Sequence, residues 1–458
     1  MPKIFIIATI LLSLLSPILA DSKVHEQILA NGLKVIVKED HRAPIVISQV
    51  WYKVGSSYEH DGVTGISHAL EHMMFKGTQK YGPGKFSEII AANGGSENAF
   101  TGRDYTAYFQ KLAKDRLEIA LELEADRMRN LALLPAEYAK EIKVVTEERR
   151  LRTDDNPTAL TVEHFYAAAY MIAPYRNPII GWMSDLKTMS VDKLQTWYQK
   201  WYAPNNATLV VVGDVEPTQV FALANKYFGH LQAEKISHPI IRTEPKQLGL
   251  KRIAVKAPAK ESYLVMGYKT PTLEPTKLED WEPYALDMLS YILDGGSSAR
   301  FSKQLIRGSQ IASNIDADYS IFNRLPEMLT IDGTPAKGHT VAELEQAIRK
   351  QITRLQKEPV SPKELQRVRQ QIIAKKIFLK DSIFYQAMEI GILETVGLKW
   401  QLSDEYVSRI SAVTAEQVQL VAQKYLVDDN LTIAVLEPQP LDSATHPVAY
   451  KGASNIVR

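Results

Sequence analysis

The sequence predicts an α+β protein made of two homologous halves, each an α/β sandwich in which helices cover a mainly antiparallel sheet. Its 458 residues are too many for one typical hydrophobic core and suit two domains of roughly 200 residues each. Residues 199–212 resemble residues 423–436, which lie 224 positions later. In both copies a helix leads through a polar turn into a strand. An internal duplication therefore explains the length.

The elements of the first half follow from the spacing of apolar residues. Alternating or continuous apolar runs predict strands at residues 32–38, 45–53, 105–112 and 208–212. Helical spacing predicts longer helices over residues 115–130, 135–152 and 191–202. A short helix is expected between Thr64, a capping residue, and Gly77, a residue type that ends helices.

A polar stretch with two prolines separates the halves. The second copy of the repeat begins its helix at Thr414 as the first does at Ser190, and both are favourable N-cap residues. We expect five segments along the chain: a signal peptide over 1–20, an N-terminal domain over 21–232, a linker over 233–249, a homologous domain over 250–440 and a tail over 441–458.

The first twenty residues have the pattern of a secretory signal peptide. Lys3 precedes an apolar run over residues 4–15, and the small residue Ala20 precedes Asp21. The run is interrupted by Pro17 and is short for a membrane span of about 20 residues. We therefore expect an exported protein, periplasmic in a Gram-negative bacterium, with no membrane contact once the leader is removed. Retention of the leader is the alternative.

Composition excludes several classes of function. Lys and Arg total 54 against 53 for Asp and Glu, a formal charge of +1, so no overall field favours nucleic acid as a partner. There is no cysteine, which removes thiolate nucleophiles and cysteine-based metal sites. Histidine and carboxylate remain as the strong ligands for an ion such as zinc.

The short helix after Thr64 carries the motif His-x-x-Glu-His. His68 and His72 are four residues apart and project from the same face, so both imidazoles can reach one ion. Glu71 lies beside them but offset around the helix, which suits activation of a water better than metal ligation. A catalytic zinc needs three protein ligands and an open position, so a third ligand must come from elsewhere.

A second predicted helix offers candidates for that ligand. Glu141 and Glu148, seven residues apart, fall on the same side of this helix. That side also carries Val144 and Val145, which makes it the expected inward side, whereas Glu147 falls toward solvent. We choose Glu148 as the third ligand of a single Zn²⁺ per chain and Glu141 as a carboxylate that orients a histidine.

These residues resemble a known family. The motif with Glu148, 76 positions after His72, resembles the inverzincins: pitrilysin, insulysin and the mitochondrial processing peptidase. Residues 178–182 and 295–300 add to the resemblance. It implies a zinc metalloendopeptidase that hydrolyses peptides or unfolded segments, with Glu71 as general base on the zinc-bound water.

The resemblance also implies how a substrate binds. Residues matching Asn98, Ala99, Phe100 and Thr101 form an edge strand that pairs with an extended peptide in such enzymes. Main-chain hydrogen bonds of this kind recognise a peptide irrespective of its side chains. Length and flexibility of the substrate should therefore matter more than its sequence.

One departure from the family concerns the second half. Family members that complete the site there carry an Arg and a Tyr seven positions apart, but here Arg307 is followed at that distance by Asn314, and the next tyrosine is Tyr319. The chain is most similar to short, two-domain bacterial members whose homologous partner carries that pair. A heterodimer is therefore expected, with a homodimer as the alternative.

Two other functions remain open from sequence. A non-catalytic family member could use the same architecture for binding or assembly, although such relatives typically lose motif residues that this chain keeps. A structural zinc site would leave Glu71 without a task.

Overall fold

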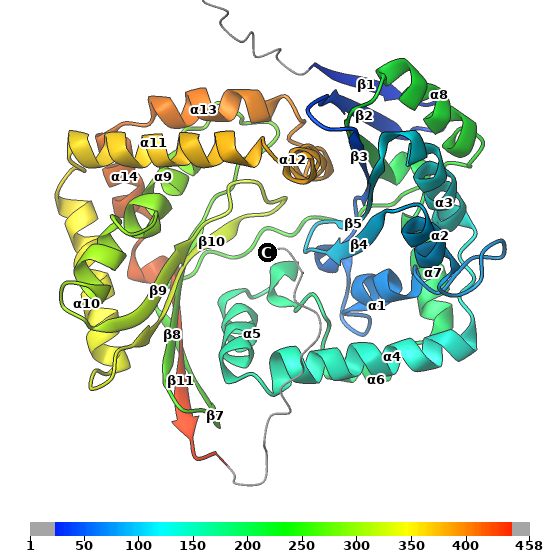
Figure 1. The fold of residues 1–458 in the computed structure, drawn as a ribbon. Helices are drawn as coiled ribbons and strands as arrows, with labels where there is room; N and C mark the ends of the chain where they lie inside the picture. Colours follow the sequence, from blue (N-terminus) through cyan, green and yellow to red (C-terminus); the bar gives the residue numbers. More distant parts are fainter. Residues whose placement is uncertain (1–22, 442–458) are drawn as a thin grey trace, which may run out of the picture.

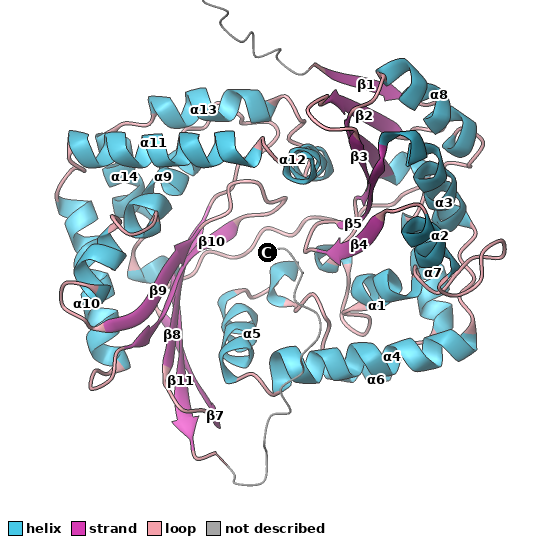
Figure 2. Ribbon diagram, viewed as in Figure 1, coloured by secondary structure: helices cyan, strands magenta, loops and turns pink. Residues whose placement is uncertain are grey.

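A computed structural model describes residues 23–441. The predicted signal peptide lies outside the described residues, as do residues 442–458 of the predicted tail. None of the described helices combines the length and the apolar composition that a membrane crossing requires. The chain forms two halves, each with its own sheet and helices (Figures 1 and 2), which confirms the predicted fold class.

The N-terminal half contains a six-stranded sheet in the order β1-β2-β6-β3-β5-β4. Strands β2 and β6 pair in parallel, and every other neighbouring pair is antiparallel. Strand β6 is buried along its whole length because both faces of the sheet are covered. The strands are β1 (Val24–Ile28), β2 (Lys34–Glu39), β3 (Ile45–Tyr52), β4 (Ser96–Thr101), β5 (Thr106–Ala113) and β6 (Ala207–Gly213).

Helices α3 and α8 pack directly on this sheet, and α1 packs between β4, α4 and α7. The predicted longer helices are present with ends shifted by one to three residues. The helices of this half are α1 (Ile66–Met73), α2 (Lys85–Ala92), α3 (Leu117–Arg129), α4 (Pro135–Arg149), α5 (Pro157–Ala169), α6 (Met183–Lys187), α7 (Val191–Trp201) and α8 (Pro217–Phe228).

The C-terminal half repeats this topology without an equivalent of β1. Its sheet has the order β7-β11-β8-β10-β9, again with one parallel pair, β7 with β11. Its strands are β7 (Lys251–Pro258), β8 (Tyr263–Thr270), β9 (Ala312–Asp318), β10 (Glu327–Pro335) and β11 (Leu431–Gln439). Its helices are α9 (Glu282–Asp294), α10 (Val341–Lys357), α11 (Pro362–Leu379), α12 (Ile383–Thr395), α13 (Leu402–Ala412) and α14 (Ala415–Tyr425).

The repeated helix, turn and strand occupy the same place in both halves. Ser190 caps α7 and Thr414 caps α14, each through its side-chain oxygen. The strands that follow, β6 and β11, start 224 residues apart and both lie next to the parallel partner of their sheet. The structure thus agrees with an internal duplication.

The halves exchange one helix each, which the sequence did not predict. Helix α5, from the first half of the chain, packs on β7, β8 and β11, and α12, from the second half, packs on β3 and β6. Phe165 of α5 is buried against the second sheet, and Gly391 of α12 lies against Trp51 of the first. Each sheet is therefore covered on its inner face by a helix of the other half (Figure 1).

The segment between the halves has neither helix nor strand over residues 232–250. One side chain fixes it to the end of α5. The carboxylate of Glu244 accepts hydrogen bonds from the backbone nitrogens of Met171, Ile172 and Ala173, and it pairs with Lys269 at 2.9 Å. Although burial opposes ionisation, these donors lower the pKa of Glu244 to about 2. The boundaries 21–232, 233–249 and 250–440 stay predictions.

Two local expectations were wrong. Thr64 does not cap α1, because its hydroxyl donates to Asp185, and the buried carboxylate of Glu59 instead accepts from the backbone nitrogens of Gly65 and Ser67. Val144 does not point into a core. It is 48% exposed because its side of α4 borders an open cleft, while Val145 beside it is buried.

Candidate metal centre

Helix α1 is held in place by two glycines in the left-handed region of backbone conformation. Gly65 has φ 84° and Gly181 has φ 85°. A Cβ on Gly65 would lie 2.5 Å from the carbonyl oxygen of Ile180, and one on Gly181 would lie 2.3 Å from that of Thr64. Only glycine allows this approach of two backbones. It brings the loop at residues 178–182 against the start of the helix that carries His68 and His72.

The structure brings the three predicted ligands together. His72 Nε2 lies 3.2 Å and His68 Nε2 lies 3.7 Å from Glu148 Oε2. One ligand atom from each of these residues falls within 4.8 Å of the others. Helix α1 supplies both imidazoles and α4, which packs on it, supplies the carboxylate. No other group of three such residues is present in the part of the chain that the structure describes.

The two histidines have opposite electrostatic environments. Burial, assisted by the neighbouring His72, lowers the pKa of His68 to about 4. Burial also acts against a charge on His72, but the hydrogen bonds of Glu141 and Glu148 outweigh it and raise the pKa of His72 to about 9. Burial opposes ionisation of Glu148 as well, yet its hydrogen bond with His72 keeps its pKa below the ordinary value.

A second carboxylate contacts the far side of one imidazole. Glu141 Oε2 lies 3.3 Å from His72 Nδ1, and Glu141 Oε1 lies 2.6 Å from Lys76 Nζ. Because Nδ1 of His72 is engaged in this way, its Nε2 is left to face Glu148 and His68. This is the arrangement in which an outer carboxylate fixes the orientation of a ligating imidazole. Nδ1 of His68, by contrast, is buried without a partner among the described residues.

Glu71 lies in the same cleft and is held by a residue of β4. Thr101 Oγ1 donates a hydrogen bond of 2.5 Å to Glu71 Oε2. Burial raises the pKa of Glu71 above its ordinary value, and the hydrogen bond from Thr101 opposes the rise only in part. A raised pKa brings a carboxylate closer to the range in which general bases work.

The cleft around these residues has a volume of about 1160 Å³. One wall is β4, which is the edge strand of its sheet, and the predicted residues Asn98, Ala99, Phe100 and Thr101 all line it. The opposite wall comes from α4 and α5 and from the loop at residues 176–180. Within residues 23–441 the cleft thus places a sheet edge that has no neighbouring strand beside the three candidate ligands.

Sequence reasoning missed cationic residues of the cleft, among them Arg152 and Arg103. Arg152 Nη1 lies 2.8 Å from Glu148 Oε1, so Glu148 is shared between an arginine and the histidines. Arg103 pairs with Glu327 of β10 at 2.5 Å and stacks over the ring of Tyr166. The position of Arg152, four residues after Glu148 on a helix, could have indicated its pairing. The partner of Arg103 lies 224 residues away, and nothing local indicates it.

The positions of the Arg and Tyr pair that the family resemblance left in doubt lie outside the metal cleft. Arg307 lines a different pocket from the metal cleft and donates to the carbonyl of Ser297. Asn314 accepts a hydrogen bond from the backbone of Thr334 within the second sheet, and Tyr319 is buried with its hydroxyl on the carbonyl of Pro271. None of the three lines the cleft that contains His68.

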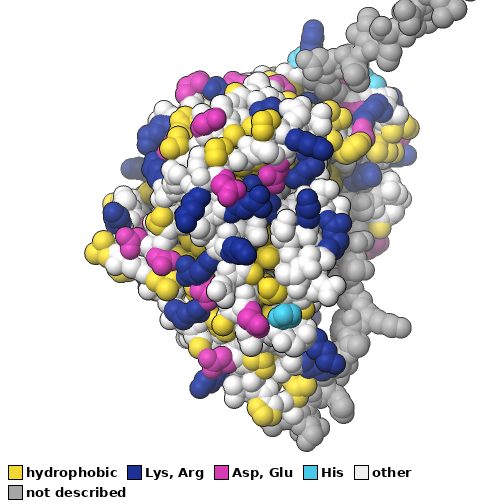
Figure 3. Space-filling view, turned by 90° about the vertical axis from the view of Figure 1, so that its left-hand side faces the viewer, with side chains coloured by type: hydrophobic (Ala, Val, Ile, Leu, Met, Phe, Trp, Pro, Cys, Tyr) yellow, Lys and Arg dark blue, Asp and Glu magenta, His cyan; other side chains and the backbone are white. Residues whose placement is uncertain are grey.

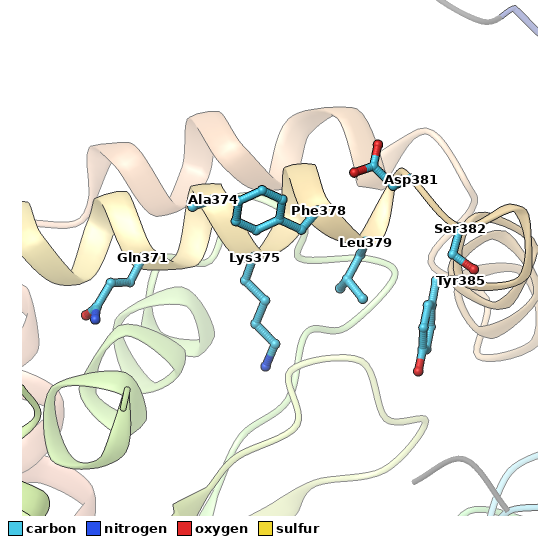
Figure 4. A pocket seen from close by; sticks show the side chains of 8 residues that line it. All are labelled: Gln371, Ala374, Lys375, Phe378, Leu379, Asp381, Ser382 and Tyr385. Carbon is cyan, nitrogen blue, oxygen red and sulfur yellow. The ribbon is translucent and has the colours of Figure 1, made fainter. Parts of the chain in front are cut away.

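A second pocket lacks the ligand residues that the metal cleft contains. It measures about 590 Å³ and lies where α11 ends and α12 begins, with Lys375, Leu379 and Tyr385 pointing to the same side (Figure 4). It contains neither histidine nor glutamate. Its single carboxylate, Asp381, cannot form a three-ligand set, so the metal cleft remains the candidate site.

The donor set of the cleft fits zinc. Two imidazoles and one carboxylate are a ligand set of catalytic zinc sites, and three protein ligands leave a position open. The engaged Nδ1 of His72 and the absence of any competing thiolate agree with this choice. Because Glu71 lines the same cleft as the three candidate ligands, the arrangement can support metal-assisted hydrolysis.

Comparisons with known proteins agree with this chemistry. The family described as "Insulinase (Peptidase family M16)" matches residues 34–182, which include the motif and Glu148, and the family described as "Peptidase M16 inactive domain" matches residues 188–372. Together the two matches cover more than half of the chain. The second match begins after Glu148 and contains none of the candidate ligands.

Individual relatives cover most of the chain. The zinc protease PqqE of Helicobacter pylori is 36% identical over 63% of this chain, and the match spans 65% of that protein, just under two thirds. A probable mitochondrial-processing peptidase subunit beta of Arabidopsis thaliana is 25% identical over 90% of this chain and 77% of its own length. The crystal structure of a protease from Helicobacter pylori superimposes with a TM-score of 0.87 at 29% identity and covers 91% of this chain and 100% of its own. The chain belongs to peptidase family M16, the pitrilysin and mitochondrial processing peptidase family of zinc proteases.

Proposed function

We propose that the chain is a zinc-dependent endopeptidase that hydrolyses peptides or unfolded segments. One observation carries the proposal: ligand atoms of His68, His72 and Glu148 lie within 4.8 Å of one another, and Glu71 lines the same cleft. Zinc bound there would polarise the scissile carbonyl and acidify a water molecule.

The residues of the chain have separate tasks in this proposal. Glu71 takes the proton of the attacking water and delivers it to the leaving amine. Thr101 holds Oε2 of Glu71, which leaves Oε1 to accept the proton. Glu141 keeps the imidazole of His72 in the orientation that ligation needs.

Substrate binding is assigned to the edge of the first sheet. Residues 98–101 of β4 have no strand on their outer side among the described residues, and they line the cleft next to Glu71. An extended peptide can add there as a further strand through main-chain hydrogen bonds. Such binding selects for flexible, unfolded segments over particular side chains.

We further propose that a second chain completes the enclosure. Arg307, Asn314 and Tyr319 lie outside the cleft, so a homologous partner would supply the missing Arg and Tyr, with a homodimer as the alternative. The name of the Arabidopsis relative as a subunit supports this proposal. The pattern of residues 1–20 supports export, with a periplasmic location.

Glu71→Gln tests the mechanism. We expect kcat for cleavage of a quenched fluorescent peptide to fall by roughly 10²–10⁴, because the variant keeps its size but cannot accept a proton. Zinc content, measured by mass spectrometry, should remain at one ion per chain. Glu147→Gln is the matched control, because Glu147 lines the same cleft, is exposed and pairs with Arg150.

The assay is run on the chain alone and together with a homologous partner. Full turnover by Glu71→Gln would exclude the proposed base. A wild-type chain that binds zinc and cuts no peptide even with its partner would instead support a binding or assembly role.

A further inference from the structure

A second cluster of charged residues lies in the C-terminal half, away from the metal cleft. A pocket of about 990 Å³ is formed between the segment at residues 298–308, the end of α10 and the start of α11. Of the residues that line it, one is acidic and six are basic: Arg300, Lys303, Arg307, Arg354, Lys363 and Arg367. Figure 3 shows this side of the molecule, where Lys and Arg side chains gather on the face.

The concentration of positive charge is local. The whole chain carries a formal charge of only +1, so a general excess of basic residues does not explain it. The ammonium groups of Lys303 and Lys363 form no ion pair or hydrogen bond with any described residue, and both side chains are exposed. Like charges held around one hollow repel each other, and an anion bound there would relieve the repulsion.

The most informative residue of the pocket is Arg300, which is only 8% exposed. Its Nε and Nη2 donate to the two carboxylate oxygens of Glu364 at 3.1 and 2.9 Å. Its Nη1 is buried and has no acceptor among residues 23–441. A buried charged donor without a partner costs free energy, so an acceptor from outside the chain would complete it.

The start of α11 adds to the positive electrostatic potential of the pocket. This helix has 18 residues, Ser361 caps it and Lys363 stands in its first turn. The backbone nitrogens of a helix start carry partial positive charge and favour anions. Arginine forks and helix starts together match phosphate groups, which offer several oxygens on one compact centre.

We propose that this pocket binds a phosphate-bearing anion, with Nη1 of Arg300 as the buried donor and Lys303 and Lys363 as exposed cations. The phosphate could belong to a free oligophosphate or to the headgroup of an anionic lipid. The pocket is separate from the metal cleft, so the proposal does not depend on the proposed function.

The test measures binding of two probes to the full chain. Inorganic tripolyphosphate is titrated by calorimetry, and vesicles of phosphatidylcholine with or without phosphatidylglycerol are tested by co-sedimentation. Tripolyphosphate binding alone assigns a free phosphate, and binding to the phosphatidylglycerol vesicles alone assigns a lipid headgroup. We expect the bound probe to be released as salt is raised.

The double variant Lys303→Gln/Lys363→Gln should weaken binding roughly tenfold. The matched control Lys256→Gln/Lys260→Gln removes the same charge from exposed lysines on β7 and the following turn, and it should leave binding within about twofold. Arg300→Lys keeps the charge but loses the fork, so it should also weaken binding. If Arg300→Lys does not fold, the comparison of the two double-lysine variants still tests the proposal.

Three outcomes would overturn the proposal. The first is that neither probe binds. The second is that the two double-lysine variants weaken binding equally. The third is that an acidic peptide of equal charge binds more tightly than tripolyphosphate.

Discussion

The two halves of this chain build the same helix pair and use it differently. Helix α9 packs on α11 in the second half as α1 packs on α4 in the first. Helix α11 turns Leu365 and Ile372 into the core of its half, whereas α4 turns Glu141 and Glu148 into the metal cleft. Leu365 and Ile372 are 8% and 3% exposed and belong to the hydrophobic core of their half. The same kind of helix pair therefore holds a candidate metal centre in one half and ordinary apolar packing in the other.

One carboxyl group persists in the second half. Ala69-Leu70-Glu71-His72 resembles Ala285-Leu286-Asp287-Met288, which lies 216 residues later rather than 224, and this match pairs Asp287 with Glu71. Asp287 is fully buried and accepts a hydrogen bond from the hydroxyl of Tyr406. Burial raises its pKa to about 6. The comparison teaches that the duplicated fold tolerates a buried acid both beside a candidate metal centre and away from one.

The largest effect should come from the third ligand. Glu148→Gln should lower zinc affinity by on the order of 100-fold or more, since loss of even an outer partner costs roughly 10–100-fold. Competition with a chromogenic chelator measures the affinity, and Glu147→Gln is the control. Ile372→Val, in the core of the second half, should leave zinc content unchanged. Equal zinc affinities for wild type and Glu148→Gln would show that Glu148 is not a ligand, and the contrast between the two halves would be wrong.

Asp287 should make stability depend on pH. Because its folded pKa of about 6 lies above the ordinary 3.8, the folded state binds more protons between these values. The contribution of Asp287 to the free energy of unfolding is therefore present at low pH and is lost as the pH rises through 6. The free energy of unfolding should fall by up to about 3 kcal/mol from this group.

Urea unfolding at pH 4.5 and pH 7.5 measures the effect. Asp287→Asn should have a flatter pH dependence than wild type. Parallel profiles for the two proteins would show that Asp287 does not titrate in this range.

The exchanged helices offer a symmetric test of how the halves are joined. A Cβ at Gly391 would lie 2.0 Å from Trp51, and one at Gly267 would lie 2.4 Å from Phe165. Gly391→Ala and Gly267→Ala should each destabilise the protein by about 1–3 kcal/mol through overpacking. Both should lower the midpoint of a single urea transition, because each glycine lies at a contact between halves.

Gly82→Ala is the control, since nothing lies within 4 Å of the added atom and its φ is not positive. We expect a change within about 0.5 kcal/mol. Two separate transitions, each sensitive to one variant, would contradict the joined halves.

The smallest effect should come from the outer carboxylate. Glu141→Gln should weaken zinc binding roughly tenfold, because the amide holds Nδ1 of His72 less strongly. The same chelator competition measures it. Glu137→Gln, one turn earlier and paired with Lys140, should have no effect. A loss as large as that of Glu148→Gln would make Glu141 itself a candidate ligand.

Much of the fold could be predicted because it depends on local patterns. Apolar spacing located four strands and three longer helices of the first half to within a few residues, and N-cap residues such as Ser190 and Thr414 marked where helices begin. The capping of α1 could not be predicted, because Glu59 acts there from outside the helix. The exposure of Val144 depends on the cleft, which local periodicity does not reveal.

The sequence by itself determined the two-half α+β class, the repeat and the residue types that can hold a metal, because helix periodicity fixes which side chains share a face. Only the tertiary structure decided that α1 and α4 pack together, so that Glu148 meets His68 and His72. The same holds for the exchange of α5 and α12 and for the pairing of Arg103 with Glu327. These contacts join residues far apart in sequence, and no local pattern carries information about such distances.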